Sequence, residues 1–357
     1  MARAELVVDR LVATGFIRPS VLWRGLQHSR PSFSHWGVGW LIGLSGLLVE
    51  PLAWLQSLLY AQRLRRVQLP DDPIVIIGHW RSGTTYLHQL LASDPAVATA
   101  RNTLTVAPQV ALLLQPWIAP LMKAWMTRVR PIDAVPWGPD DPQEDELGLA
   151  RLTFDTNMGG MAFPRDYLAN FRRHVLETSK AYERQWLTFC RLTWLHDGAG
   201  KSHWLIKNSV HTARVRLVLK HFPRARFVLL RRSPVDSIRS LVQVKQRLGA
   251  LVGMQPLPDP PTQVEETATA HRELLEAFEA SRHLIPAQQL LELDYDDLIS
   301  QPLQAVEGIY TRFGLTSWPV AEAPIKARID RARSYTADPV QLPPLAERRL
   351  QELMKAS

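Results

Sequence analysis

The residues best suited to chemistry form the segment GHWRSGTTYL, from Gly78 to Leu87, which lies between an apolar run and a helical pattern. A turn from strand to helix directs backbone N–H groups and the positive end of the helix dipole at one place, and this makes an anion site. Gly83 permits close approach of the backbone, and Arg81 offers a planar cation for phosphate or sulfate oxygens. The hydroxyl donors of the segment are Ser82, Thr84 and Thr85. The segment therefore predicts a site for a phosphate or sulfate group.

This segment differs from the phosphate loop of nucleoside triphosphatases, GxxxxGK[ST]. The lysine that would follow Gly83 is Thr84, and no predicted strand ends in an obvious magnesium-binding Asp. The differences leave an anion cradle without the metal apparatus that a triphosphate needs. A mononucleotide that carries a phosphosulfate fits the loop better, and a kinase or triphosphatase is the rival interpretation.

The loop resembles the 5′-phosphosulfate loop of the sulfotransferases that use 3′-phosphoadenosine 5′-phosphosulfate (PAPS), [K/R]-S-G-T-T, which residues 81–85 match. That family also has an Arg at a strand end and a Ser eight residues later, and both bind the 3′-phosphate. In RRSPVDSIRS this pair is Arg232 and Ser240, and Arg231 is a less well spaced substitute. The resemblance implies a sulfotransferase that takes PAPS as its donor and needs no metal.

The sequence around these motifs is similar to a bacterial branch of the family that shares features with tyrosylprotein sulfotransferases. The matching segments are PQEDE at 142–146, IKNSVHTARV at 206–215 and FPRARFVLLRR at 222–232. The likeness covers roughly residues 73–315, although Asn208 and Val210 replace the usual Ser and Pro. It also implies two further nucleotide contacts: Tyr295, in a turn like the family's Y-E-D-L, and Arg333, in the late region that closes over the nucleotide.

Sulfuryl transfer needs cations at the bridging oxygen of the leaving phosphate and a base for the acceptor hydroxyl. Arg81 and the helix start supply one side of the cation clamp, and the resemblance implies Lys207, at a strand end, as the other. Two kinds of base stay open: a carboxylate, with Glu144 before Glu146, or His211, four residues beyond Lys207. Burial or a neighbouring carboxylate raises the pKa of a carboxyl group, whereas a histidine needs little tuning to act near pH 7.

Four short apolar runs, each followed by a helical pattern, must position these residues. The predicted strands are 73–78, 203–206, 226–230 and 289–293, and the helices after them are 84–93, 211–221, 234–246 and 303–313. Strands that alternate with helices indicate an α/β fold, a parallel sheet flanked by helices on both faces. The resemblance implies that this is the P-loop-like sulfotransferase fold. The proline-rich segments 131–142 and 254–262 are predicted loops.

The chain has 357 residues, a net charge of +8 and a single cysteine, Cys190. One cysteine excludes an internal disulfide framework, and the histidines lack metal-site pairings, so we expect no metal. The positive charge suits an anionic ligand or an anionic membrane surface. Nucleic acid is disfavoured, because no run of five basic residues and no nucleic-acid-binding signature occurs. No signal peptide is evident, so we expect the protein in the cytoplasm or at the inner face of its membrane.

Residues 1–70 are a predicted helical, apolar extension ahead of a sulfotransferase domain at 71–357. Within the extension, segment 36–60 carries one charge, Glu50, which Pro51 follows. Three interpretations stay open: a buried helix pair hinged at Pro51, a helix in the plane of a membrane surface, and a transmembrane span.

The apolar, Trp-bearing segments 36–60 and 111–125 favour a hydrophobic cleft or a mouth close to a membrane. The predicted acceptor is therefore a lipid, a glycolipid or another hydrophobic alcohol. A carbohydrate or a peptide tyrosine is the alternative within the class. A non-catalytic, membrane-associated nucleotide-binding module is the alternative from another class.

Overall fold

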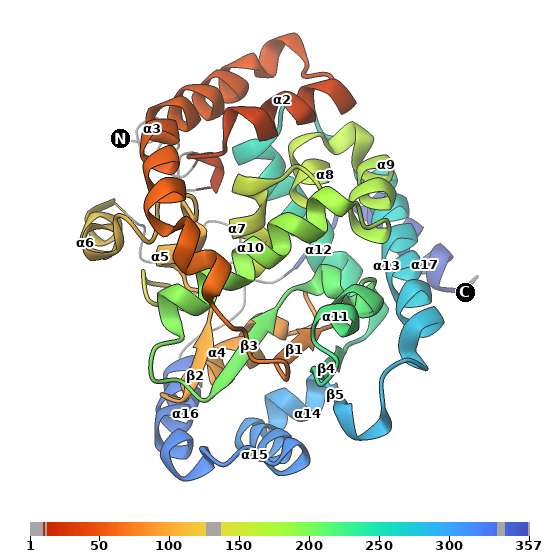
Figure 1. Cartoon of the computed structure of the whole chain (residues 1–357). Coiled ribbons are helices and arrows are strands. Elements are labelled where there is room, and N and C mark those ends of the chain that lie inside the picture. Colours follow the sequence, from red (N-terminus) through yellow and green to blue (C-terminus); the bar gives the residue numbers. More distant parts are fainter. Residues whose placement is uncertain (1–9, 11–12, 126–136, 334–339, 356–357) are drawn as a thin grey trace.

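One parallel sheet of five strands organises the molecule, in the order β2-β3-β1-β4-β5 (Figure 1). The computed structural model describes residue 10 and residues 13–125, 137–333 and 340–355. The strands are β1 (Ile74–Ile77), β2 (Val97–Thr99), β3 (His203–Lys207), β4 (Arg226–Arg231) and β5 (Leu290–Asp294). The α/β prediction is confirmed. In the central strand, Ile76 lies opposite both Lys207 and Val228, so the carboxyl ends of β1, β3 and β4 meet at one edge.

Both faces of the sheet are buried, as the continuous apolar runs predict. Successive side chains of a strand point to opposite faces, so Ile74 and Ile76 lie in one core, whereas Val75 and Ile77 lie in the other. The first core is closed by α4, α14, α15 and α16, and the second chiefly by α10 and α11. The sheet therefore fixes its carboxyl edge rigidly between two helical layers.

The helices surround this sheet and build a further layer of shorter elements above its carboxyl edge (Figure 1). Their bounds are α2 (Pro19–His28), α3 (Trp36–Arg66), α4 (Thr84–Leu91), α5 (Asn102–Thr105), α6 (Gln115–Trp125), α7 (Asp145–Leu152), α8 (Met158–Ala162), α9 (Tyr167–Phe171), α10 (Lys180–Asp197), α11 (Val215–His221), α12 (Pro234–Val252), α13 (Pro260–Arg282), α14 (Tyr295–Ser300), α15 (Pro302–Phe313), α16 (Trp318–Arg333) and α17 (Pro344–Lys355).

Several predicted boundaries were wrong. The helix expected from 211 begins only at Val215, because a 3₁₀ turn (Ser209–Thr212) precedes it. The loop expected over 254–262 ends at Pro260, where α13 begins with proline in its first turn. Of the predicted loop 131–142, residues 131–136 lie outside the described residues, and the rest form turns and one isolated bridge.

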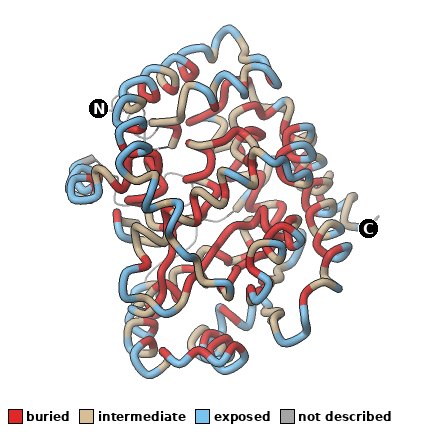
Figure 2. Tube along the Cα trace, in the orientation of Figure 1, coloured by how far each residue is buried: buried red, intermediate tan, exposed pale blue. Residues whose placement is uncertain are grey.

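The apolar segment 36–60 belongs to α3, one continuous helix that passes through Pro51. Of the three interpretations, the buried helix pair hinged at Pro51 does not fit, because α3 is a single helix and only 33% of its most apolar window is buried. Pro51 lies on the exposed side of the helix, and buried contacts at Ala53 and Gln56 continue the packed side beyond it. Figure 2 shows the outer side of α3 as exposed along much of its length.

Candidate active site

The loop between β1 and α4 turns sharply at three residues with positive φ. These are Gly78 (136°), Arg81 (68°) and Gly83 (90°). A positive φ is uncommon for a residue other than glycine, and such conformations gather at binding sites. At Gly78, a Cβ atom would lie 2.5 Å from the backbone oxygen of Leu230, so only glycine fits there. Thr212 Oγ1 also accepts a hydrogen bond from the Gly78 N–H at 2.8 Å.

The start of α4 presents unpaired backbone N–H groups. The Tyr86 and Leu87 N–H groups donate to Gly83 O, at 2.9 and 3.1 Å, whereas helix geometry leaves those of Thr84 and Thr85 without a partner inside the helix. The Ser82 hydroxyl donates to His79 O at 2.7 Å, so this predicted nucleotide contact also holds the loop itself together. The helix start and Arg81 thus lie in one loop, as the predicted anion cradle requires.

Gly83, which directly precedes α4, is a second position of the loop that favours glycine. A Cβ atom there would lie 2.6 Å from the Tyr295 ring, at a φ that other residues rarely adopt. We expect Gly83→Ala to lower the free energy of unfolding by about 1–3 kcal/mol and to weaken nucleotide binding. Gly308→Ala is the matched control: the new methyl meets nothing within 4 Å in α15, and the change should stabilise by about 0.5–1 kcal/mol. Denaturant unfolding and nucleotide titration of both variants test this, and equal effects would contradict it.

The two predicted nucleotide corners touch each other. Arg81 Nε donates to Ser240 Oγ at 2.9 Å, and Arg232 Nη1 donates to Arg81 O at 2.7 Å. The Arg232 guanidinium carbon also lies 4.2 Å from the centroid of the Tyr295 ring. Ser240 lies in α12 and Tyr295 begins α14, so four separate elements converge here. The Arg232 side chain therefore lies against the backbone of the Arg81 loop, and the Arg81 side chain lies against α12.

The other two arginines considered lie differently. Arg231 pairs with Glu292 of β5, with 2.6 Å between Nε and Oε2, and this leaves Arg232 as the strand-end arginine at the loop. Arg333 ends α16 and is exposed, 3.2 Å from Asp330. Burial raises the pKa of Tyr86 in α4, and the charge of Arg333 acts in the opposite direction, so Arg333 lies within electrostatic reach of this helix.

Lys207 and Glu144, predicted separately from the sequence, form an ion pair. Lys207 Nζ lies 2.6 Å from Glu144 Oε2, and Glu144 Oε1 accepts a hydrogen bond from the Ser209 N–H at 3.0 Å. Lys207 is the last residue of β3, and Glu144 directly precedes α7. Their side chains are 4% and 16% exposed, so the carboxylate is the more accessible of the two. A cation and a base candidate thus stand together at the same sheet edge as the loop.

The remaining base candidates are enclosed. Glu146 accepts hydrogen bonds from the Asn157 N–H (2.5 Å) and from Asn208 Nδ2 (3.0 Å), and burial raises its pKa. His211 is fully buried, and this burial, followed by the nearby charge of Arg214, lowers its pKa to about 3. A base with so low a pKa is weak at neutral pH. The site geometry therefore favours Glu144 over Glu146 and His211.

Sequence reasoning missed a pair of histidines beside the loop. The ring of His79 lies 4.4 Å from that of His271 in α13, measured between centroids. Burial lowers the pKa of both, so the pair is neutral at physiological pH. No spacing in the sequence relates α13 to the loop, and the contact exists only because both pack over the carboxyl edge of the sheet.

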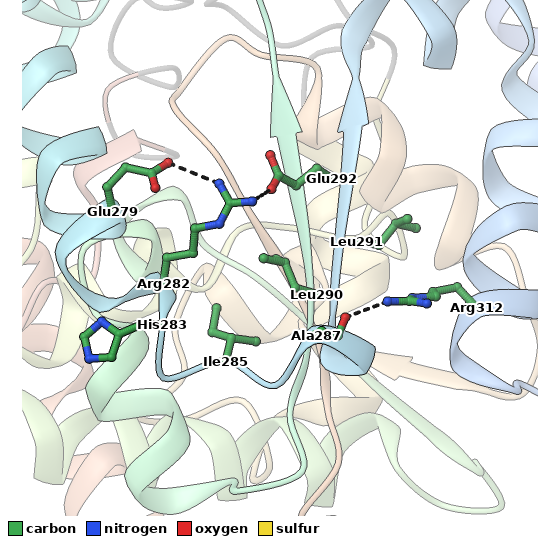
Figure 3. A pocket seen from close by; sticks show the side chains of 9 residues that line it. All are labelled: Glu279, Arg282, His283, Ile285, Ala287, Leu290, Leu291, Glu292 and Arg312. Carbon is green, nitrogen blue, oxygen red and sulfur yellow. Dashed lines mark hydrogen bonds and ion pairs between the residues drawn. The ribbon is translucent and has the colours of Figure 1, made fainter.

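A groove of about 700 Å³ lies apart from these residues, at the first residues of β5 (Figure 3). Its charged residues pair with each other: Arg282 reaches Glu279 and Glu292. The Arg312 guanidinium donates to Ala287 O at 2.6 Å. The groove is at the amino end of its strand, whereas Lys207 and Arg232 stand at carboxyl ends, so it is separate from the candidate active site.

Comparison with known proteins agrees with this arrangement. The model of the sulfotransferase family matches residues 73–319, more than half of the chain. The chain is 25% identical, over 85% of its length and 77% of theirs, to the omega-hydroxy-beta-dihydromenaquinone-9 sulfotransferases Stf3 of Mycobacterium bovis and Mycobacterium tuberculosis.

Two solved structures share the fold. The sulfotransferase STF9 of Mycobacterium avium has a TM-score of 0.65 at 16% identity, with 94% of each chain covered. The sulfotransferase STF1 of M. tuberculosis has a TM-score of 0.65 at 19% identity, with 93% of this chain and 90% of that chain covered. With the family match over the sheet and both corners of the site, these likenesses establish that the chain is an enzyme and belongs to the sulfotransferase family.

Proposed function

We propose that this sulfotransferase uses PAPS as its donor and transfers the sulfuryl group in line to the hydroxyl of a hydrophobic alcohol. The observation that carries the donor assignment is the direct contact between the two corners, Arg81 to Ser240 and Arg232 to Arg81 O. A nucleotide with an anionic group at each end needs two anion sites near each other, and these contacts support that assignment. Among the described residues, no group of three or more His, Cys, Asp or Glu side chains is placed to hold a metal ion.

The residues fit the donor at both ends. At one end, the N–H groups of Thr84 and Thr85 and the Arg81 guanidinium would hold the 5′-phosphosulfate, where glycine at position 83 lets the backbone approach closely. At the other, Arg232 and Ser240 would hold the 3′-phosphate. We assign supporting roles to Tyr295, whose ring stacks under Arg232, and to Arg333.

The catalytic roles fall to Lys207 and Glu144. PAPS supplies an activated sulfuryl group with a phosphate as its leaving group. The Lys207 ammonium, held in a nearly buried position, would stabilise negative charge at the bridging oxygen without moving a proton. The Glu144 carboxylate would accept the proton of the acceptor hydroxyl, and the Ser209 N–H fixes its orientation.

Two observations support the acceptor class: the exposed apolar surface of the protein and the names of the relatives. Large exposed apolar residues gather on the N-terminal helices and on α6. The Stf3 relatives are named for an acceptor derived from a menaquinone, which is a lipid. We therefore assign a lipid-like alcohol as acceptor, reached by peripheral contact at the cytoplasmic face of a membrane.

Incubation with isotopically labelled PAPS and a lipid and metabolite extract, in the presence of EDTA, tests this function. We expect labelled sulfate esters in the lipid fraction by mass spectrometry. Label confined to sugars or to peptide tyrosine would overturn the acceptor class, and transfer that requires a divalent metal would overturn the donor site.

A further inference from the structure

We propose that α3, together with α6, forms a docking surface for an anionic lipid bilayer, with α3 lying in the plane of the membrane surface. Fourteen of the seventeen large exposed hydrophobic residues in the described part of the chain lie between Trp23 and Leu121, and ten of these are in α3. Such a concentration is unusual on a water-facing surface and typically marks an interaction site. Attachment to a membrane surface would be the role of the helical extension ahead of residue 71.

The exposed face of α3 is almost wholly apolar between Trp36 and Leu59, where Ser57 is its one exposed polar side chain. From Trp36 to Leu59, about 35 Å of helix, no exposed residue carries a charge. Glu50, the single charged residue in this stretch, is half-buried and pairs with Arg18. The most exposed leucines, Leu48 (79%) and Leu58 (77%), stand on either side of Pro51. The uncharged, largely apolar face therefore runs along both halves of the helix.

The opposite face of α3 is fixed to the enzyme, which argues against a span. A Cβ atom at Gly46 would lie 2.1 Å from Ile17 O, so the backbones are in direct contact there. The Gln56 amide donates to Pro108 O (2.9 Å) and accepts from the Leu112 N–H (2.8 Å). These buried hydrogen bonds would break if α3 left the protein to span the hydrocarbon of a bilayer, where the freed polar groups would have no partner. The helix would therefore meet the bilayer with its outer face only.

The charges around this face suit anionic headgroups. Between Arg10 and Pro70 the chain has seven arginines, no lysine and one acidic residue, Glu50. Arg63, Arg65 and Arg66 are exposed and follow directly on the apolar stretch. Basic residues beside a buried apolar face are typical of helices that lie in a membrane interface.

The neighbouring α6 extends the same side of the molecule (Figures 1 and 2). It exposes Trp117 and Leu121, one turn apart, and the segment that leads into it is held by Gln56 and Tyr60 of α3. Tryptophans favour the headgroup level of a bilayer. A bilayer suits this face better than a second copy of the chain, because a symmetric contact would bring two arginine-rich rims close together.

This proposal rests on the proposed function, because a membrane surface would supply the hydrophobic acceptor. Its test measures only binding to vesicles and not sulfuryl transfer, so the two proposals can fail separately. Purified full-length protein is floated with phosphatidylcholine vesicles, with and without phosphatidylglycerol. We expect binding that increases with phosphatidylglycerol. Leu48→Glu and Leu58→Glu should each weaken it about tenfold or more, and Leu345→Glu, equally apolar and 67% exposed in α17, should not change it. The double variant Arg65→Gln/Arg66→Gln should bind the anionic vesicles more weakly, by about fivefold for each arginine lost, and its binding to the neutral vesicles should not change.

Three outcomes would overturn the proposal. The wild-type protein stays unbound with both vesicles, or Leu345→Glu weakens flotation as much as Leu48→Glu. In the third, the wild-type protein is a dimer that Leu48→Glu converts to a monomer, which would make a second copy the occupant of this face. Circular dichroism of each variant confirms that the fold is retained.

Discussion

We expect Lys207→Ala to lower the rate of sulfuryl transfer within the bound complex by about two to three decades, the usual cost of losing one donor at a developing anion. The Lys207 side chain is 4% exposed, and in such surroundings a fixed cation stabilises charge more than it would in water. Affinity for the nucleotide should change much less, because Arg81, Arg232 and the α4 N–H groups remain. Single-turnover experiments with labelled PAPS measure the rate, and titration with adenosine 3′,5′-bisphosphate measures the affinity.

Lys220→Ala is the matched control for this experiment. Lys220 also pairs with a glutamate at 2.6 Å, but its side chain is 61% exposed, and it lies in α11 on the surface. Exposed ion pairs contribute little, so the rate should stay within about twofold of the wild type. If Lys207→Ala kept a similar rate, Lys207 would have no place in the mechanism.

The second large effect is expected for Glu144→Gln, which should lower the transfer rate by about two to four decades. The amide keeps the size of the side chain and an oxygen that accepts from the Ser209 N–H, but it cannot take a proton from the acceptor hydroxyl. Binding of adenosine 3′,5′-bisphosphate should persist. Single-turnover rates at saturating donor and acceptor therefore separate the lost base from a damaged donor site.

Glu146→Gln distinguishes this account from its nearest alternative. Because Glu146 holds the Asn157 N–H and the Asn208 side chain in a buried place, this change should lower the free energy of unfolding by about 1–3 kcal/mol. The transfer rate of the folded enzyme should fall far less than in Glu144→Gln. The reverse ranking of the two rates would make Glu146 the base and contradict the assignment of Glu144.

The strands and helices that carry the site could be predicted because each apolar run is long enough and is followed by a helical period. Strand β2 could not be predicted, because three residues are too few to show a hydrophobic pattern. It forms only because it pairs with β3 in the folded protein. The continuous α3 could not be predicted either. Pro51 favours a break, but contacts such as Gln56 with Leu112 hold the helix in line and come from residues far away in the chain.

The anion cradle was visible because its residues are consecutive. The pairing of Lys207 with Glu144 was not, because 62 residues lie between them and no spacing rule connects β3 with the start of α7. His211 illustrates the opposite error. Its type suits acid–base work, but its burial against Trp186, at 5.0 Å between ring centroids, is a property of the fold alone.

In the proposed function, Arg232 and the loop at Arg81 hold opposite ends of one nucleotide. Calorimetric titration in EDTA, with adenosine 3′,5′-bisphosphate and with adenosine 5′-phosphate, tests it in the wild type and in Arg232→Ala. The quantity compared is the ratio of the two affinities. A substitution that loosens the loop and weakens both nucleotides equally therefore leaves this ratio unchanged. The wild type should prefer the bisphosphate by about ten- to a hundredfold, and the preference should vanish in Arg232→Ala. An undiminished preference in Arg232→Ala, or none in the wild type, would contradict the account.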